Sequence, residues 1–540
     1  MTAAPTTTVY RGHVFTGTSE AEAVALREGA VLTVGTADEV LAAAGNDAEI
    51  VDATGLVIPG VIDSHVHLQM HGDGALRADL VRATSLGEIQ AIVGEWAQAH
   101  PDAPRVLGRS WNHDMLEGRA PTRQMLDEVV ADRPCYLDSG DYHSVWCNSA
   151  ALAELGVDGT TPDPSGGRIH RDADGVATGL LDETAMTTIA WPFLAEQRSD
   201  AERDANLARA YRDFHAAGVT SVVDMAVTED DWAAFQRVAH AGALPLHVGA
   251  HWLIDATLPL PERLRVVARA AEARDGSHPL VESRGIKIIS DGVIDGCTAA
   301  LSEPYTGGER PGPIWPVDEL VPVIRAADEA GLAVAVHAIG DAAVSTTLDA
   351  FEQVLGYAPT RPHRHRIEHL EYASPDAAER CARLGIVVSM QPVHSDPFIL
   401  THWRAMLGEE RAERGFAWPE YVAAGACLVF GTDTPTAPHA ALPNLWIATT
   451  RRSAFEPGLP PNHADFALPV AQALTHATAD AAYGCGAEGE RGTLAPGMSA
   501  DLAVLDRDPL REGPEALLRG RVLRTVVAGQ VVHDTGELTA

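Results

Sequence analysis

Six side chains that can bind a metal or transfer a proton lie within or directly after short apolar runs: His65, His67, Lys287, His337, His369 and Asp433. In an extended segment, residues i and i+2 point to the same face, so His65 and His67 can direct two imidazoles toward one point. Four imidazoles, one amine and one carboxylate offer only nitrogen and oxygen ligands, which suit Zn²⁺ or a neighbouring first-row ion such as Mn, Fe or Co. The sequence therefore predicts a metal centre. For Asp433 taken alone, a turn that caps the next helix is the alternative reading.

Lys287 is the only lysine in the chain, and every other residue among the 40 lysines and arginines is an arginine. It lies between two isoleucines, where a buried ammonium is costly unless it is paired or neutralised. One interpretation is an ion pair with a nearby carboxylate such as Asp291. The other is a carboxylated lysine, an anionic oxygen ligand that bridges two metal ions. The second interpretation also explains why arginine does not replace this residue, because arginine stays protonated.

The elements that must position these side chains are eight short apolar runs separated by amphipathic helical stretches. The expected strands are residues 60–63, 219–224, 246–250, 286–290, 333–337, 366–369, 387–390 and 428–431. This alternation predicts an α/β fold with a (β/α)8 TIM barrel over residues 60–485, whose chemistry lies at the carboxyl ends of the strands. The long gap after the first strand predicts a large inserted subdomain at about residues 70–215.

Both ends of the chain are rich in short predicted strands. These strand-rich ends are residues 1–59 and 486–540. We therefore expect a small β-sandwich domain built from both termini.

Charge and composition exclude several classes of partner. The formal net charge is −35, from 40 Lys+Arg against 75 Asp+Glu. Nucleic acid and anionic membranes both require a basic surface, so neither is an expected partner. There is no recognisable signal peptide or membrane span, and the six scattered cysteines form no C-x-x-C pair. We expect a cytoplasmic protein with a small-molecule substrate, and a homodimer is a candidate assembly.

At this point the sequence resembles the amidohydrolase superfamily. The resemblance rests on Pro-Gly-Val-Ile-Asp-Ser-His-Val-His at 59–67, the lysine, the two later histidines, Gly-Thr-Asp at 431–433 and the segment 492–505. Segments 108–113, 139–152 and 178–183 resemble the branch that includes N-substituted formamide deformylases. The resemblance implies His65 and His67 on one metal, His337 and His369 on a second, carboxylated Lys287 between them, and Asp433 as the catalytic carboxylate.

These residues predict hydrolysis of an amide or N-formyl C–N bond by metal-activated hydroxide, with two Zn²⁺ ions as the expected cofactor. A mononuclear deaminase, or a hydrolase of cyclic amides or esters, is the alternative within the superfamily. Lys287 weighs against the deaminase, because that class lacks a bridging lysine. A non-catalytic scaffold is disfavoured because all six expected positions are filled.

The insertion offers candidate substrate contacts: Trp111, His113, Asp141, His143 and Trp146. Aromatic and hydrogen-bonding groups there could cover the mouth of the barrel, whereas the alternative is that they form the core of the insertion. Cys297 stands where a small or polar residue is expected, and its thiol could line the pocket or simply pack in the core.

Overall fold

The computed structural model describes residues 7–74, 76–140, 142–164, 166–275, 277–357 and 361–538. The chain divides into two compact units, one made of Met1–Leu68 and Leu207–Ala540 and the other of Gln69–Asn206. The sequence placed the end of the insertion near residue 215. The compact unit ends earlier, inside helix α7 (Asp200–Ala216).

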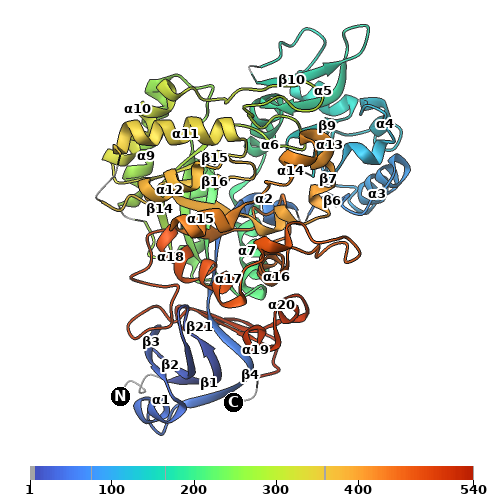
Figure 1. The fold of residues 1–540 in the computed structure, drawn as a ribbon. Coiled ribbons are helices and arrows are strands. Elements are labelled where there is room, and N and C mark those ends of the chain that lie inside the picture. Colours follow the sequence, from blue (N-terminus) through green and yellow to red (C-terminus); the bar gives the residue numbers. More distant parts are fainter. Residues whose placement is uncertain are drawn as a thin grey trace. The chain divides into compact units, whose positions relative to one another are not determined.

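The larger unit contains a barrel of eight parallel strands (Figure 1). The strands are β5 (Val61–Val66), β12 (Val219–Val227), β13 (His247–Leu253), β14 (Val281–Ile289), β15 (Ala333–Ala338), β16 (Arg366–His369), β17 (Val387–Met390) and β18 (Leu428–Phe430). They hydrogen-bond in sequence order, and a parallel bridge between Val66 and Thr434 joins the last strand to the first. The predicted (β/α)8 barrel is confirmed.

Helices surround the barrel because the outward-facing strand residues are apolar. Ile286 and Ile288 of β14 share one core cluster with Leu320 and Val323 of helix α10. The principal helices of this layer are α8 (Glu229–Ala241), α9 (Leu260–Arg274), α10 (Val317–Glu329), α11 (Asp341–Leu355), α12 (Ala377–Leu384), α15 (Trp418–Ala424), α16 (Ala441–Thr450), α17 (Val470–His476) and α18 (Ala479–Gly484). Burial of this apolar layer supplies most of the driving force for folding, at about 25 cal/mol per Å².

A register shift in β14 determines where Lys287 points. The pairing with β13 skips Arg284, because Ala250 pairs with Ser283 and His251 with Gly285. Before the shift, the hydroxyl of Ser283 donates outward to the carbonyl of Ala270 in α9. A bulge of this kind reverses which residues face inward. Lys287 therefore faces the barrel interior.

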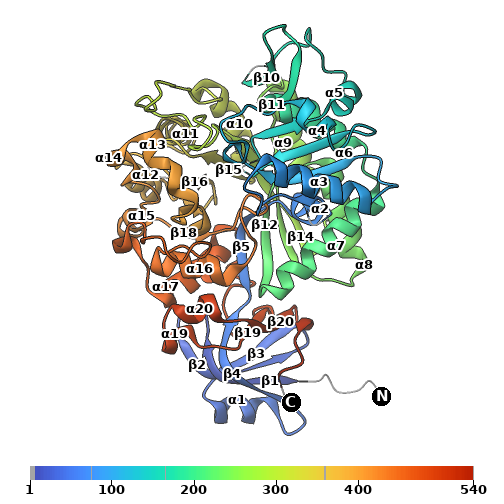
Figure 2. The same cartoon turned by 90° about the vertical axis from the view of Figure 1, so that its right-hand side faces the viewer.

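The small domain contains strands from both ends of the chain, which Figures 1 and 2 show in blue and red. Its seven strands lie in the order β21-β20-β19-β4-β1-β2-β3. The first four along the chain are β1 (Thr8–Phe15), β2 (Glu20–Arg27), β3 (Ala30–Gly35) and β4 (Glu49–Pro59), and the last three are β19 (Leu502–Leu505), β20 (Val522–Val527) and β21 (Gln530–Asp534). The strands form one continuous sheet that bends around a core including Val24, Val57 and Val504. A bridge between Ala30 and Ser499 brings the β3 edge against the segment before β19.

Asp501 fastens this sheet to the barrel. Its Oδ1 accepts a hydrogen bond from the amide of Ala528 at 2.6 Å, and its Oδ2 lies 3.1 Å from Nε2 of His247, the first residue of β13. Burial alone would raise the pKa of Asp501, but His247 and the amide of Ala528 hold that pKa below its usual range. Asp501 therefore links the sheet of the small domain to the barrel sheet.

We predict that Asp501→Asn lowers the free energy of unfolding by about 1–3 kcal/mol at pH 7, because the buried carboxylate charge beside His247 and the amide of Ala528 is lost. The folded-state pKa is lower than the unfolded value, so this contribution is present above about pH 4 and is lost as the pH falls through the folded-state value. Urea denaturation measured from pH 7 to acid tests this. Asp52→Asn, which removes the exposed partner of Arg11 in the same sheet, is the control and should change stability by at most about 1 kcal/mol.

The insertion has a core of its own. Its six-stranded sheet has the order β10-β11-β9-β8-β7-β6, and Trp111 and Trp146 lie in the cluster beneath it. The strands are β6 (Ala78–Asp79), β7 (Val106–Trp111), β8 (Cys135–Ser139), β9 (Ser144–Cys147), β10 (Gly167–Arg171) and β11 (Ala177–Glu183), with helices α3 (Leu86–Ala99), α4 (Arg123–Asp127), α5 (Ser149–Leu155) and α6 (Trp191–Glu196). This unit is therefore able to bury its large aromatic residues by itself.

All six cysteines are free thiols. Within the part of the chain that the structure describes, no helix combines the length and apolarity needed to cross a lipid bilayer.

Candidate metal centre

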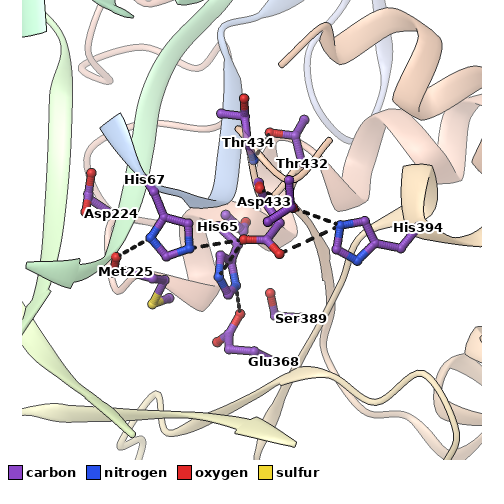
Figure 3. Close-up of polar contacts among 12 residues, drawn as sticks. His65, His67, Asp224, Met225, Glu368, Ser389, His394, Thr432, Asp433 and Thr434 are labelled. Atoms are coloured by element: carbon purple, nitrogen blue, oxygen red, sulfur yellow. Dashed lines mark hydrogen bonds and ion pairs between the residues drawn. The ribbon is translucent and has the colours of Figure 1, made fainter. Parts of the chain in front are cut away.

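His65, in β5, and His67, directly after it, both turn Nε2 toward one carboxylate (Figure 3). Nδ1 of His65 donates to Oε2 of Glu368 at 2.7 Å, and Nδ1 of His67 donates to the carbonyl of Met225 at 2.6 Å. An acceptor on Nδ1 orients each ring, so that Nε2 is the atom that faces Asp433. The Nε2 atoms lie 3.3 and 3.1 Å from Oδ1 of Asp433.

Asp433 is held at this point by the closure of the barrel. Its amide donates to the carbonyl of His65 at 2.7 Å, and the amide of His67 donates to the carbonyl of Thr434 at 3.0 Å. The backbone of Asp433 is left-handed, with φ of 57°, which turns its carboxylate toward the histidines. Burial alone would raise its pKa, but the imidazoles of His65 and His67 hold the pKa of Asp433 well below its usual range. The group is therefore an anion at neutral pH.

His369 completes a close cluster with His65 and Asp433, because one ligand atom from each lies within 4.8 Å of the others. His369 follows Glu368 directly, yet both side chains point into the barrel interior. The left-handed backbone of His369, with φ of 77°, makes this possible. Its Nδ1 is buried and has no hydrogen-bond partner among the described residues. A buried nitrogen without a hydrogen-bond partner is a candidate metal ligand.

His337 stands beside this cluster. Its ring centroid is 4.5 Å from that of His369, and its Nε2 lies 3.2 Å from the carbonyl oxygen of Gly292. The side chain therefore reaches the centre from β15, but its Nε2 faces the loop after β14.

Lys287 is 2% exposed and faces the interior from β14. Burial lowers the pKa of Lys287 to about 8, against the opposing effect of the Glu368 and Asp433 charges. One of the two interpretations of Lys287 is an ion pair with Asp291. The carboxylate of Asp291 instead accepts hydrogen bonds from the backbone amides of Ile339, Gly340 and Ala300, at 3.0, 2.9 and 2.9 Å. Asp291 is therefore engaged in holding the loops after β14 and β15.

Protonation supports ligand chemistry at the histidines. Burial, with a smaller effect from Lys287, lowers the pKa of His65 to about 4. Burial also lowers the pKa of His369 well below its usual range. Both rings are neutral at pH 7, which is the state that binds a metal.

His394 belongs to the site but was not predicted from the sequence. It follows β17 in the short helix Pro392–Ser395, where Nδ1 lies 3.0 Å from Oε1 of Glu371 and Nε2 lies 3.7 Å from Oδ2 of Asp433. Its ring is parallel to that of His369 at 5.9 Å. The signal that could have identified His394 is its position soon after the seventh strand, since the fifth and sixth strands also end in histidines. Glu368, also missed, directly precedes a predicted ligand.

The insertion residues predicted to contact substrate have other roles where they are described. Trp111 and Trp146 are fully buried, and their indole N–H groups donate to the carbonyls of Leu137 and Thr122 at 2.8 and 3.0 Å. These two residues are therefore core, which corrects the prediction, because their rings pack in the core of the insertion and their indole N–H groups are taken up by backbone carbonyls.

The remaining predicted contacts differ in their surroundings. His113 is exposed, and Nδ1 of His143 pairs with Oε2 of Glu183 at 2.9 Å. Asp141 lies outside the described residues. Cys297 is partly exposed in the loop after β14 with φ of 55°, and burial raises the pKa of its thiol. These placements leave the role of His113, His143 and Cys297 as a prediction.

The family model named "Amidohydrolase family" matches residues 49–533. This chain belongs to the amidohydrolase family. It is 32% identical to YtcJ of Bacillus subtilis (strain 168) over 95% of this chain and 96% of that protein. It is 30% identical to N-substituted formamide deformylase of Arthrobacter pascens over 95% of each chain.

The fold matches a solved relative along almost its whole length. An uncharacterized metal-dependent hydrolase from Pyrococcus horikoshii OT3 superimposes with a TM-score of 0.76 and 26% identity, over 94% of this chain and 98% of that chain. The comparisons therefore support hydrolase activity, and His65, His369 and Asp433 form a group that could hold a metal ion.

We predict that Gly431→Ala disrupts the centre. A Cβ atom at Gly431 would lie 2.6 Å from the amide nitrogen and 2.8 Å from Cβ of His65, so β18 and β5 must separate. A displacement of about 1 Å at a reacting site can cost about 100-fold in rate, and we expect a similar loss in metal affinity. Metal content after gel filtration measures the effect. Gly458→Ala, where a Cβ would meet no atom within 4 Å, is the control and should retain wild-type metal content.

Proposed function

We propose that this amidohydrolase cleaves a non-peptide C–N bond, an amide or N-formyl amine of a small molecule, with divalent metal held by its barrel residues. The observation that carries the proposal is the convergence of two imidazole Nε2 atoms on one carboxylate oxygen, at 3.3 and 3.1 Å. The similarity to N-substituted formamide deformylase supports the substrate class.

The donor set fits Zn²⁺. His65, His67, His369 and Asp433 offer borderline nitrogen and oxygen donors, and the buried Nδ1 of His369 has no other partner among the described residues. His337, whose ring centroid lies 4.5 Å from that of His369, would be a further ligand. A divalent ion held by these side chains would lower the pKa of water from about 16 to about 7 and would polarise a carbonyl oxygen.

Lys287 would supply the bridge between two ions as a carbamate. With its pKa lowered to about 8, about a tenth of the amine is neutral at pH 7. The neutral amine adds to the carbon of CO₂ and releases one proton, which leaves an anionic carbamate with two oxygens. This converts the one buried cation on β14 into a ligand and removes the cost of burying an ammonium.

Asp433 would move the proton. Its depressed pKa keeps it deprotonated, so it can accept a proton from the attacking water and deliver that proton to the leaving nitrogen. One C–O bond forms, the C–N bond breaks, and the products are a carboxylate and an amine. His394, which faces Oδ2 of Asp433 from β17, borders the same space.

We predict that Asp433→Ala reduces kcat by about 10²–10⁴-fold toward N-alkyl formamides while most of the metal stays bound, because the imidazoles remain. Initial rates together with elemental analysis test this. Asp501→Asn, which perturbs the fold away from the centre, should retain wild-type kcat. A wild-type rate in Asp433→Ala would remove this residue from the chemistry.

We predict that Lys287→Arg lowers the metal content from about two ions per chain to at most one, because a guanidinium stays protonated and forms no carbamate. In wild-type protein equilibrated with ¹³C-bicarbonate, a carbamate carbonyl signal is expected by NMR, and the variant should lack it. Two ions in the variant, or no carbamate signal in the wild type, would contradict a bridging lysine.

A further inference from the structure

Arg366 is a fully buried arginine inside the barrel, two residues before Glu368 on β16. Its Nη2 donates to the carbonyl of Ser64 on β5 at 2.7 Å and to the hydroxyl of Ser389 on β17 at 2.8 Å. Its Nε and Nη2 also donate to the two carboxylate oxygens of Glu368, at 2.5 and 3.2 Å. One guanidinium therefore links three barrel strands.

The carboxylate of Glu368 transmits this anchoring to His65. Its Oε2 accepts the Nδ1 proton of His65 at 2.7 Å, and Figure 3 shows Glu368 below the imidazole with Ser389 beside it. The side chains of His65 and Glu368 are 1% and 0% exposed. The result is a buried series of three groups, guanidinium, carboxylate and imidazole, that ends at a predicted metal ligand.

Arg366 also fixes the backbone of that ligand. The carbonyl that it holds belongs to Ser64, the residue directly before His65. His65 is thus restrained at its ring through Glu368 and at its main chain through Ser64. With Nδ1 occupied and the backbone held, the ring has one orientation in which Nε2 faces Asp433.

Stability alone does not account for this arrangement. A buried arginine–carboxylate pair contributes little net stability, because the cost of desolvating two charges offsets their attraction. Apolar side chains of the same volume would pack the barrel as well. A group that orients a metal ligand has an effect that apolar packing cannot reproduce.

We propose that Arg366 is a positioning residue of the metal centre, which acts on His65 through Glu368 and through the carbonyl of Ser64. This inference rests on the proposed metal-binding function. It assigns to Arg366 and Glu368 the task of fixing the tautomer and the direction of one ligand.

The test measures metal binding by full-length protein at one fixed pH. Zn²⁺ affinity is obtained by competition with a chromophoric chelator, and the visible spectrum of Co²⁺-substituted protein reports ligand geometry independently of activity. The variants are Arg366→Lys, which keeps the charge and loses the forked contacts, and Glu368→Gln, which keeps the shape and loses the charge. The matched control is Arg451→Lys, because Arg451 is also fully buried but contacts the carbonyl of Asn462 and the ring of Trp418.

We expect each of the two variants to bind Zn²⁺ about 10–100-fold more weakly than wild type and to change the Co²⁺ spectrum. The double variant should lose no more Zn²⁺ affinity than the single variant with the larger loss, because both residues act on the same ring. Arg451→Lys should stay within about threefold of wild type. A Glu368→Gln protein that melts near the wild-type temperature separates this effect from misfolding if Arg366→Lys is unstable.

Wild-type affinity and spectrum in a folded Glu368→Gln protein would overturn the positioning role while leaving the proposed function intact. Equal weakening in Arg451→Lys would also overturn it, because any buried arginine would then have the same effect. Absence of metal binding by the wild-type protein would overturn the proposed function, and the positioning role with it.

Discussion

The site depends on the seam where the first barrel strand meets the last. Two backbone hydrogen bonds close this seam, from the amide of Asp433 to the carbonyl of His65 at 2.7 Å and from the amide of His67 to the carbonyl of Thr434 at 3.0 Å. They bring residues from opposite ends of the barrel sequence into contact. The imidazole pair and the carboxylate therefore face each other only if the barrel is closed.

Two of the predicted ligands have strained backbones. His369 and Asp433 both have positive φ, at 77° and 57°, and such a conformation costs about 1–3 kcal/mol for a residue other than glycine. Strain of this kind persists only where the surroundings enforce it. At Asp433 the seam does so, together with Thr432, whose amide and hydroxyl both donate to the carboxylate of Asp63 at 2.9 and 2.7 Å. The strained backbone lowers the stability of the fold but directs the side chains of His369 and Asp433 toward the site.

The sequence was sufficient to predict the barrel and to place candidate ligands at the strand ends, because apolar runs followed by histidine are a local signal. It could not show that Arg366 and Glu368 belong to the site, since alternating polar residues on a strand usually face solvent rather than a barrel interior. His394 was missed because a short helical turn separates it from β17. Trp111 and Trp146 were misread because a tryptophan beside polar residues looks the same in sequence whether it binds a ligand or fills a core. The shift at Arg284, which turns Lys287 inward, has no sequence signature.

The shared terminal sheet has a consequence for biosynthesis. Pro59 at the end of β4 pairs with Leu502 of β19, so a strand made early by the ribosome receives its partner only when nearly the whole polypeptide has been translated. Until then one edge of β4 has no neighbouring strand, and exposed strand edges are sites of aggregation in nascent chains. Production of this protein should therefore depend on chaperones that shield that edge during synthesis.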